Sequence, residues 1–317
     1  MDAVLTTTAA AQPANLASDW RAVVARFLAA EDIKQSSRGL YGRTLSRFFS
    51  WLEQSGRLAL LYSGQLSRAD IVAYKDGLIA EGLSPLTIGS YIVIVRKFFA
   101  AMEAEKLYPN ITKGIKAPRK EKGFRKAHLS PAKASALLEQ SRDSLRDYAI
   151  INLMLRTGLR TIEVVRADIA DITYKGDTRV LLIWGKGHDS KDNFVVLTDK
   201  AFAPLQAYLR TRKGAKPGEP LFTSTSHRNA GGRLTTRTIS GLCKAGLRTI
   251  GLDSHEFTAH SLRHTTACAI LQAGGQLTDA QAVLRHQSPV TTQIYTESIK
   301  EQLRLERAPE QALDAVF

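Results

Sequence analysis

The sequence predicts a mainly α-helical protein with a small antiparallel β-sheet, divided into two domains. Apolar residues recur at helical spacing along most of the chain, as Leu45, Phe48 and Leu52 do. Three short stretches within 171–197 are rich in β-branched residues and are separated by turn residues, which is typical of strands. A stretch with prolines, glycines and many charges, 108–127, interrupts the helical pattern and divides the chain.

The part before this interruption, residues 1–107, is predicted to be a short tail followed by a small all-helical domain. Residues 1–16 are rich in alanine and threonine and predict a flexible tail. The domain over 17–107 is expected to hold four helices, at 19–30, 36–56, 67–81 and 84–105. Pro85 falls in the first turn of the fourth helix, where a proline is tolerated.

The part after the interruption predicts a larger α/β domain over 128–300, with a charged C-terminal tail at 301–317. Its sheet is an antiparallel meander of strands expected at 171–174, 179–184 and 193–197. Its helices are expected at 130–140, 143–157, 161–167, 199–212, 235–250, 259–273, 278–284 and 290–297.

The charge of the chain indicates a polyanionic partner. There are 44 Lys and Arg residues against 30 Asp and Glu, so the formal net charge is +14. Nucleic acid is the first candidate and an anionic membrane surface the second, while a basic protein without such a partner remains the alternative. The linker 108–127 carries about +6 of this charge. Either it is simply solvated or it lies along a phosphate backbone.

Several classes of protein fit this sequence poorly. Cys243 and Cys268 are not in a zinc-ligand pattern, and so few cysteines are typical of a reducing cytosol. Residues 1–15 lack the basic and apolar regions of a signal peptide. We find no run of about 18 apolar residues that would predict a membrane span. The sequence therefore predicts a cytoplasmic protein that does not use a membrane.

Two basic motifs could bind an anion. His260, Arg263 and His264 are spaced i, i+3 and i+4, so they share one helix face. Arginine can hold two phosphate oxygens and histidine exchanges a proton near neutral pH, although a solvated polar face has the same pattern. Arg160 follows Gly158 at a break between two helices, and Glu163 could orient an arginine or only balance its charge.

Two further motifs carry a lysine and a tyrosine. Lys186 lies between two glycines in the turn of a predicted hairpin, where most lysines are ordinary surface residues and a few reach a phosphate site. His286 precedes Tyr295 by nine residues. A tyrosine near a chain end usually packs, and as a nucleophile it needs activation because its unperturbed pKa is about 10.

Taken together, the order and spacing of these motifs resemble those of the tyrosine recombinase (phage integrase) family, in its two-domain, Xer-like form. The resemblance covers the chain from about residue 17 and is strongest over 145–297. It includes the 23-residue step from Arg263 to His286. Two positions depart from the family pattern. Arg285 stands where many members have glycine and could add a phosphate contact, and Thr266 stands where many have an aromatic residue.

The resemblance implies how DNA would be cleaved. Tyr295 would attack a phosphodiester and form a 3′-phosphotyrosine, while Arg160 and Arg263 stabilise the charge on the phosphoryl oxygens. Lys186 would protonate the leaving 5′-oxygen, His260 would accept the tyrosine proton and His286 would hydrogen-bond the phosphate. Glu163 would support this set, and for His264 we expect a structural hydrogen bond. No metal and no cofactor are expected, because the sequence shows neither a cluster of carboxylates for Mg²⁺ nor an ATP-binding loop.

The resemblance also implies a SAM-like, core-binding helical domain and a catalytic domain that clamp double-stranded DNA core sites. Expected DNA contacts outside the catalytic set are Arg43, Arg47, Thr87, Ser90, Lys116, Arg119 and Lys120. Family members act as homo-tetramers on two DNA sites, and the 301–317 tail could be exchanged between protomers or fold back on its own domain. The sequence leaves open whether a second recombinase or an accessory protein is needed, and whether the outcome is integration, excision or dimer resolution.

Three alternatives remain open at this point. A type IB topoisomerase would use similar chemistry without joining partners, and the helical first domain argues against it. A DNA-binding protein without catalysis would have lost the nucleophile or an arginine, and none is missing. A metal-dependent nuclease would require the carboxylate cluster that the sequence does not show.

Overall fold

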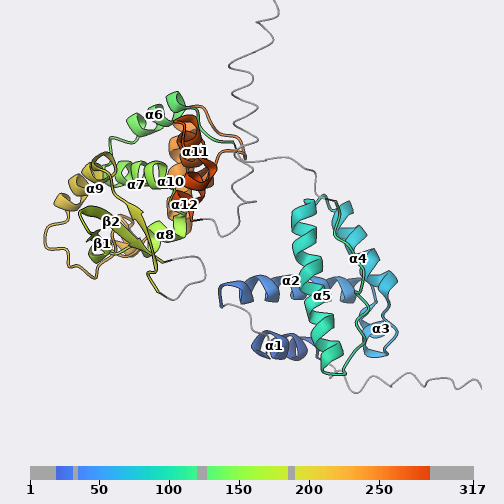
Figure 1. Ribbon diagram of the computed structural model, residues 1–317. Helices are drawn as coiled ribbons and strands as arrows, with labels where there is room; N and C mark the ends of the chain where they lie inside the picture. Colours follow the sequence, from blue (N-terminus) through green and yellow to red (C-terminus); the bar gives the residue numbers. More distant parts are fainter. Residues whose placement is uncertain (1–18, 31–34, 120–126, 185–189, 286–317) are drawn as a thin grey trace, which may run out of the picture. The chain divides into compact units, whose positions relative to one another are not determined.

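The computed structural model describes residues 19–30, 35–119, 127–184 and 190–285. The chain divides into two compact units, 1–122 and 123–317 (Figure 1). Lys120, Lys186, His286 and Tyr295 lie outside the described residues, as do both predicted tails and the helix expected at 290–297.

Within the first unit, the residues that the structure describes form five helices: α1 (Trp20–Ala30), α2 (Gln35–Gln54), α3 (Leu58–Tyr62), α4 (Arg68–Ala80) and α5 (Pro85–Ala104). Side-chain caps define the N-terminal ends of α5 and α4. Ser84 Oγ accepts a hydrogen bond from Thr87 N at 3.2 Å, and Asp70 Oδ2 accepts from Ser67 N at 2.9 Å. The four expected helices are observed as α1, α2, α4 and α5, but the count of four was too low. The prediction missed α3, which is only one turn long and whose N-cap residue, Arg57, makes no side-chain cap.

Aromatic rings fill the core of the helical unit. The rings of Trp20 in α1 and Phe49 in α2 stack at 4.6 Å, and Phe48 meets Phe99 of α5 edge to face at 6.1 Å. α5 is also the one helix among the described residues that is long and apolar enough to cross a membrane by composition alone. Its apolar face lies in this core, where Phe98 and Phe99 are almost completely buried, as expected for the central helix of a bundle.

The second unit combines helices with a three-stranded antiparallel sheet of order β1-β2-β3. In this sheet Ile172 pairs with Leu181, and Val180 pairs with Val196. The strands are β1 (Ile172–Lys175), β2 (Thr178–Ile183) and β3 (Asn193–Val196). The helices are α6 (Pro131–Gln140), α7 (Leu145–Thr157), α8 (Thr161–Arg166), α9 (Asp199–Thr211), α10 (Thr236–Thr249), α11 (Ala259–Gln272) and α12 (Leu277–Leu284). The predicted fold class, mainly helical with a small antiparallel sheet, is confirmed.

α7 is the central helix of this unit. It packs against both α9 and α11, and its residues Ile150 and Leu153 are completely buried. α11 packs in turn against α12. This arrangement brings the C-terminal ends of α7 and α12 to the side of α11 that carries Arg263. Cys243 and Cys268 are buried, and burial raises the pKa of each thiol to about 12.

Candidate active site

Gly158 ends α7 and allows Arg160 to begin α8. Its φ of +63° lies in the left-handed region, and its amide donates a hydrogen bond to Met154 O at 2.9 Å. A Cβ atom at this position would come within 2.6 Å of Leu284 Cδ2, so only glycine fits without a shift. Leu159 then turns into the core, completely buried, and Arg160 follows as the extended N-cap residue of α8.

Glu163 is a buried carboxylate that binds two arginines. Its side chain is 1% exposed. Oε1 accepts from Arg160 Nη1 at 2.7 Å, while Oε2 accepts from Arg160 N and from Arg285 Nη2, both at 2.8 Å. A buried charge requires such partners to offset its desolvation. The prediction left open whether Glu163 orients an arginine, and the structure shows it bound to the guanidinium of Arg160.

Arg263 lies almost completely buried on α11, with 1% of its surface exposed. Its guanidinium donates through Nη1 to Gly158 O and through Nη2 to Leu284 O. These carbonyls lie at the ends of α7 and α12, where a helix leaves its last carbonyls without intrahelical partners. Arg263 therefore connects both helix ends, which is a more enclosed position than the open helix face that the spacing suggested.

The two histidines of α11 differ in exposure. His260 is exposed and His264 is 5% exposed, and their rings meet edge to face with centroids 4.6 Å apart. His264 is thus enclosed beside Arg263, whereas His260 can meet a ligand.

A cavity of about 810 Å³ brings three of the predicted residues to one surface. Arg160, His260 and Arg263 all line it. Arg237 and Lys244 of α10 line it too; Arg237 adds positive charge that motif reasoning missed, while Lys244 is paired with Asp253 at 3.2 Å. α10 buries Ile239, Cys243 and Leu247 and leaves these two residues on its polar face, but nothing in that pattern indicates which site the face borders. The cavity is large enough for a phosphodiester segment, and basic side chains line it, which favours an anionic substrate.

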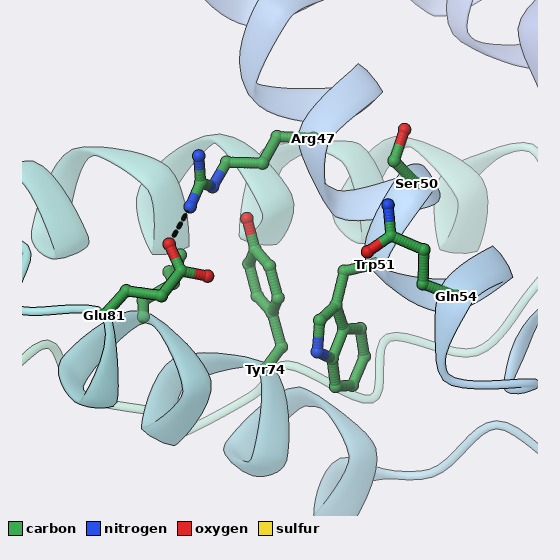
Figure 2. Close-up of a pocket in the computed structure, with 7 residues that line it drawn as sticks. Arg47, Ser50, Trp51, Gln54, Tyr74 and Glu81 are labelled. Carbon is green, nitrogen blue, oxygen red and sulfur yellow. Dashed lines mark hydrogen bonds and ion pairs between the residues drawn. The ribbon is translucent and has the colours of Figure 1, made fainter.

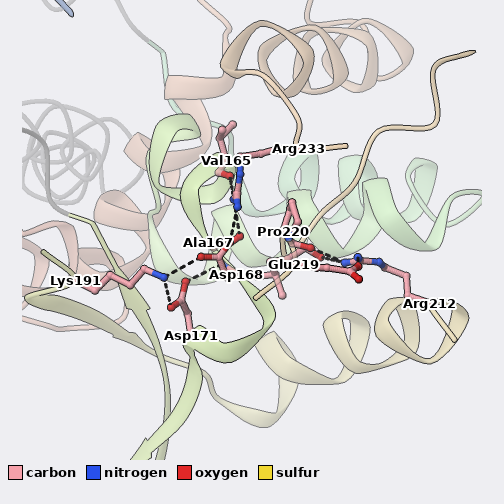
Figure 3. A network of polar contacts seen from close by, with 10 residues as sticks. Val165, Ala167, Asp168, Asp171, Lys191, Arg212, Glu219, Pro220 and Arg233 are labelled. Atoms are coloured by element: carbon pink, nitrogen blue, oxygen red, sulfur yellow. Dashed lines mark hydrogen bonds and ion pairs between the residues drawn. The ribbon is translucent and has the colours of Figure 1, made fainter. Parts of the chain in front are cut away.

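A polar network links the residue range just before β3 to the start of β1 (Figure 3). Lys191 Nζ donates to Asp171 Oδ1 at 2.5 Å and to Asp168 Oδ2 at 3.0 Å. Arg233 Nη2 donates to the other oxygen of Asp168 at 2.6 Å. Burial alone would lower the pKa of Lys191, but its hydrogen bonds with the two carboxylates outweigh burial and raise it. Lys191 therefore stays protonated and anchors the chain five residues after Lys186.

In the helical unit, Arg43 and Arg47 occupy different environments. Arg43 is exposed and has no hydrogen bond or ion pair with any described residue. Arg47 pairs with Glu81 beside a small cavity of about 200 Å³, into which the Tyr74 ring projects from α4 (Figure 2). Burial raises the pKa of the Tyr74 hydroxyl, so it remains protonated.

The other expected DNA contacts lie at the start of α5 and in the linker. Thr87 and Ser84 share a hydroxyl hydrogen bond of 2.9 Å, and Ser90 Oγ donates to Leu86 O at 3.0 Å. Lys116 and Arg119 are exposed. Among the residues that the structure describes, no group of three or more His, Cys, Asp or Glu side chains could hold a metal ion.

The sequence profile of the Phage integrase family matches residues 128–302, which is more than half of the chain. The chain belongs to this family. The tyrosine recombinase XerC of Actinobacillus pleuropneumoniae serotype 7 (strain AP76) is 32% identical over 254 residues, covering 76% of this chain and 80% of the relative. The tyrosine recombinase XerD of Caulobacter vibrioides (strain ATCC 19089 / CIP 103742 / CB 15) is 31% identical over 276 residues, covering 83% of this chain and 86% of the relative.

Solved structures agree on the fold of the family. The XerH site-specific recombinase bound to palindromic difH substrate, in a post-cleavage complex, matches with a TM-score of 0.70 at 21% identity, over 91% of this chain and 84% of that one. A lambda integrase dimer bound to a COC′ core site matches with a TM-score of 0.64 at 19% identity, over 86% of this chain and 94% of that one. This family member is a tyrosine site-specific recombinase, an enzyme that cuts and rejoins DNA strands.

Proposed function

We propose that Tyr295 attacks a scissile phosphodiester, forming a 3′-phosphotyrosine bond and releasing the 5′-oxygen of the next nucleotide. His260 accepts the phenolic proton, and Lys186 gives a proton to the 5′-oxygen. His286 hydrogen-bonds the phosphate. Rejoining reverses these steps with a 5′-hydroxyl as the nucleophile, so the phosphodiester energy is kept in the covalent bond and neither ATP nor another cofactor takes part.

The observation that carries this proposal is the shared cavity of Arg160, His260 and Arg263. In-line attack builds negative charge on the non-bridging phosphoryl oxygens, and groups fixed beforehand stabilise it without reorganisation. Glu163 fixes Arg160, and two helix-end carbonyls fix Arg263. The arginines thus supply the positive charge that metal ions supply in many nucleases. The assignment of Lys186, His286 and Tyr295 rests on the family pattern.

Double-stranded DNA core sites are the proposed substrate, bound by both units. Arg43, Lys116 and Arg119 are exposed cations suited to phosphate contacts. Arg47 would first have to leave Glu81. Thr87 and Ser90 would have to redirect hydroxyls that now bond within α5, and Lys120 joins the proposed set on sequence grounds alone. Such contacts set the position of the enzyme on the duplex more than they read its sequence.

We infer that the active assembly is a homo-tetramer on two DNA sites, working in the cytoplasm. The residues 301–317 are proposed to dock on a neighbouring protomer. Two of the matched structures support a DNA partner. The XerH recombinase is bound to its difH substrate, and the lambda integrase is a dimer bound to a core site. A second recombinase or an accessory protein completes the assembly if the chain alone is inactive.

Covalent trapping tests the proposed nucleophile. The protein is incubated with DNA from its genetic neighbourhood that carries a nick beside the cleavage position, so that the cleaved end diffuses away. We expect a protein–DNA adduct on a denaturing gel for the wild type and for Tyr174→Phe, a change at an exposed tyrosine of β1. Tyr295→Phe should form none. An adduct that persists in Tyr295→Phe would disprove the assignment.

A further inference from the structure

Arg285 adopts a backbone conformation that arginine normally avoids. Its φ is +54°, and within the described residues Lys106 is the only other residue besides glycine with a positive φ. The left-handed region costs an ordinary residue about 1–2 kcal/mol relative to a right-handed conformation, and glycine adopts it without this cost. An arginine at this position is therefore held against its backbone preference.

The side chain of Arg285 makes a buried ion pair rather than reaching solvent. Only 10% of it is exposed, and Nη2 donates to Glu163 Oε2 at 2.8 Å. Nη1 donates to Val283 O at 2.6 Å, closing the turn after α12. Nε is buried and finds no hydrogen-bond partner among the described residues. The contact with Glu163 thus joins two segments that are 122 residues apart in sequence.

The charges of this group explain what the second arginine does. Glu163 alone would neutralise Arg160, and a neutralised arginine would stabilise a phosphate poorly. With Arg285 present, one carboxylate serves two guanidinium groups, so the group keeps a net charge of +1 at the edge of the cavity. Arg285 also occupies one acceptor position of Glu163 Oε2, while Glu163 Oε1 accepts from Arg160 Nη1.

The same turn also reaches the second arginine of the cavity. Leu284 O accepts from Arg263 Nη2, and the next residue, Arg285, holds Glu163. Two successive residues at the end of α12 therefore determine where both cavity arginines lie. The residue that follows them is His286.

We propose that Arg285 is a positioning residue for DNA cleavage, which acts through Glu163 to orient the guanidinium of Arg160 and to keep its positive charge available to the scissile phosphate. This inference rests on the proposed function. It assigns a role to a side chain that many family members lack, and it places Arg285 behind Arg160 rather than against the DNA.

The test compares Arg285→Gly with the wild type on two substrates. One is the nicked DNA described above. The other carries a methylphosphonate at the scissile position, where a methyl group replaces a charged oxygen. The measured quantities are the single-turnover rate of adduct formation at saturating protein and the Kd for the same DNA, determined with Tyr295→Phe as the uncleaving background.

We expect Arg285→Gly to lower the rate of adduct formation on charged DNA by about 10- to 100-fold, the range found when partners that orient metal ligands are removed. The Kd should change by less than about threefold, because the DNA surface is untouched. On the methylphosphonate the loss should shrink to a few fold, since less negative charge develops. A merely structural role would reduce both rates equally, and that result would overturn the proposal.

Two controls make the result readable. Lys106→Gly relieves the other positive φ, in the helical unit, and should leave both rates unchanged. Arg285→Gln removes the charge but keeps a long side chain, so it repeats the comparison if glycine loosens the turn. If the wild type forms an adduct and both Arg285 variants match it within twofold, the positioning role is wrong and the proposed function stands. If the wild type forms none on DNA that it binds, the proposed function itself fails.

Discussion

A Cβ atom on Gly158 would lie 2.6 Å from Leu284 Cδ2, where the end of α7 meets the end of α12. Both residues use their carbonyl oxygens to hold Arg263. The close approach of these two helix ends therefore decides where a cavity arginine lies.

Gly158→Ala should destabilise the protein in two ways. The positive φ disfavours alanine by about 1–2 kcal/mol, and the clash with Leu284 adds about 1–3 kcal/mol of overpacking. Urea unfolding measures the sum. Gly176→Ala is the matched control, because Gly176 has a φ of +58° and a Cβ atom added there would meet no other atom within 4 Å. Equal losses in the two variants would show that the Leu284 contact does not matter.

Glu163→Gln should cost about 3–5 kcal/mol of unfolding free energy, since it leaves buried positive charge without its counterion. DNA cleavage should fall as well, because an amide holds Arg160 less firmly. Glu139→Gln removes a solvent-exposed partner of Arg142 and should cost far less, because water screens that pair. Chemical denaturation of the three proteins side by side decides this, and a Glu163→Gln protein as stable as Glu139→Gln would contradict the expectation.

The Asp168 network should contribute to acid sensitivity. Burial alone would raise the pKa of Asp168, but hydrogen bonds from Arg233 and Lys191 outweigh it and lower the pKa. A lowered pKa in the folded state stabilises the protein above the unfolded value of about 3.9, and this contribution is lost as the pH falls through the folded pKa.

Lys191→Met removes one of the two cations that lower the pKa of Asp168. We expect the variant to lose about 1–3 kcal/mol at pH 7, the range for a charged hydrogen bond, and to show a shallower fall in stability between about pH 5 and 2. The pKa of Lys191 is raised, so its own contribution persists through neutral pH and is lost only above the unfolded value, as the pH rises through the folded pKa. If the unfolding free energies of the wild type and Lys191→Met fall in parallel as the pH is lowered, Lys191 does not lower the pKa of Asp168.

Arg43→Ala should weaken DNA binding more than Arg47→Ala does. Arg43 is exposed without a protein partner among the described residues, whereas Arg47 is paired with Glu81. One lost phosphate contact reduces the dependence of log K on log salt concentration by about one. Titrations at several salt concentrations give both slopes, and the reverse order would place Arg47 on the phosphate instead.

The sequence predicted those elements that have a strong period or a clear cap. The helix expected at 84–105 is observed as Pro85–Ala104, because Ser84 and Pro85 mark its start. It did not predict α3, whose five residues are too few to show a period and whose N-cap residue is Arg57. The strands differ from the predicted ranges by about one residue, as is usual where alternation fades at the ends.

For the site, spacing within one helix was enough to place His260, Arg263 and His264 together, but burial was not predictable from it. Arg263 is enclosed because α7 and α12 both end against it, which is a matter of tertiary packing. The bridge from Arg285 to Glu163 joins residues 122 positions apart, and no local pattern reports such a contact. Arg237 and Lys244 were missed for the same reason.

The enclosure of Arg263 means that this part of the enzyme is assembled when the chain folds and not when DNA arrives. The entropy of ordering that long side chain, about 1.5–2 kcal/mol, is then borne by folding and does not weaken DNA binding. Heating that loosens only the end of α12 should therefore inactivate cleavage while the separate aromatic core of the helical unit is still intact.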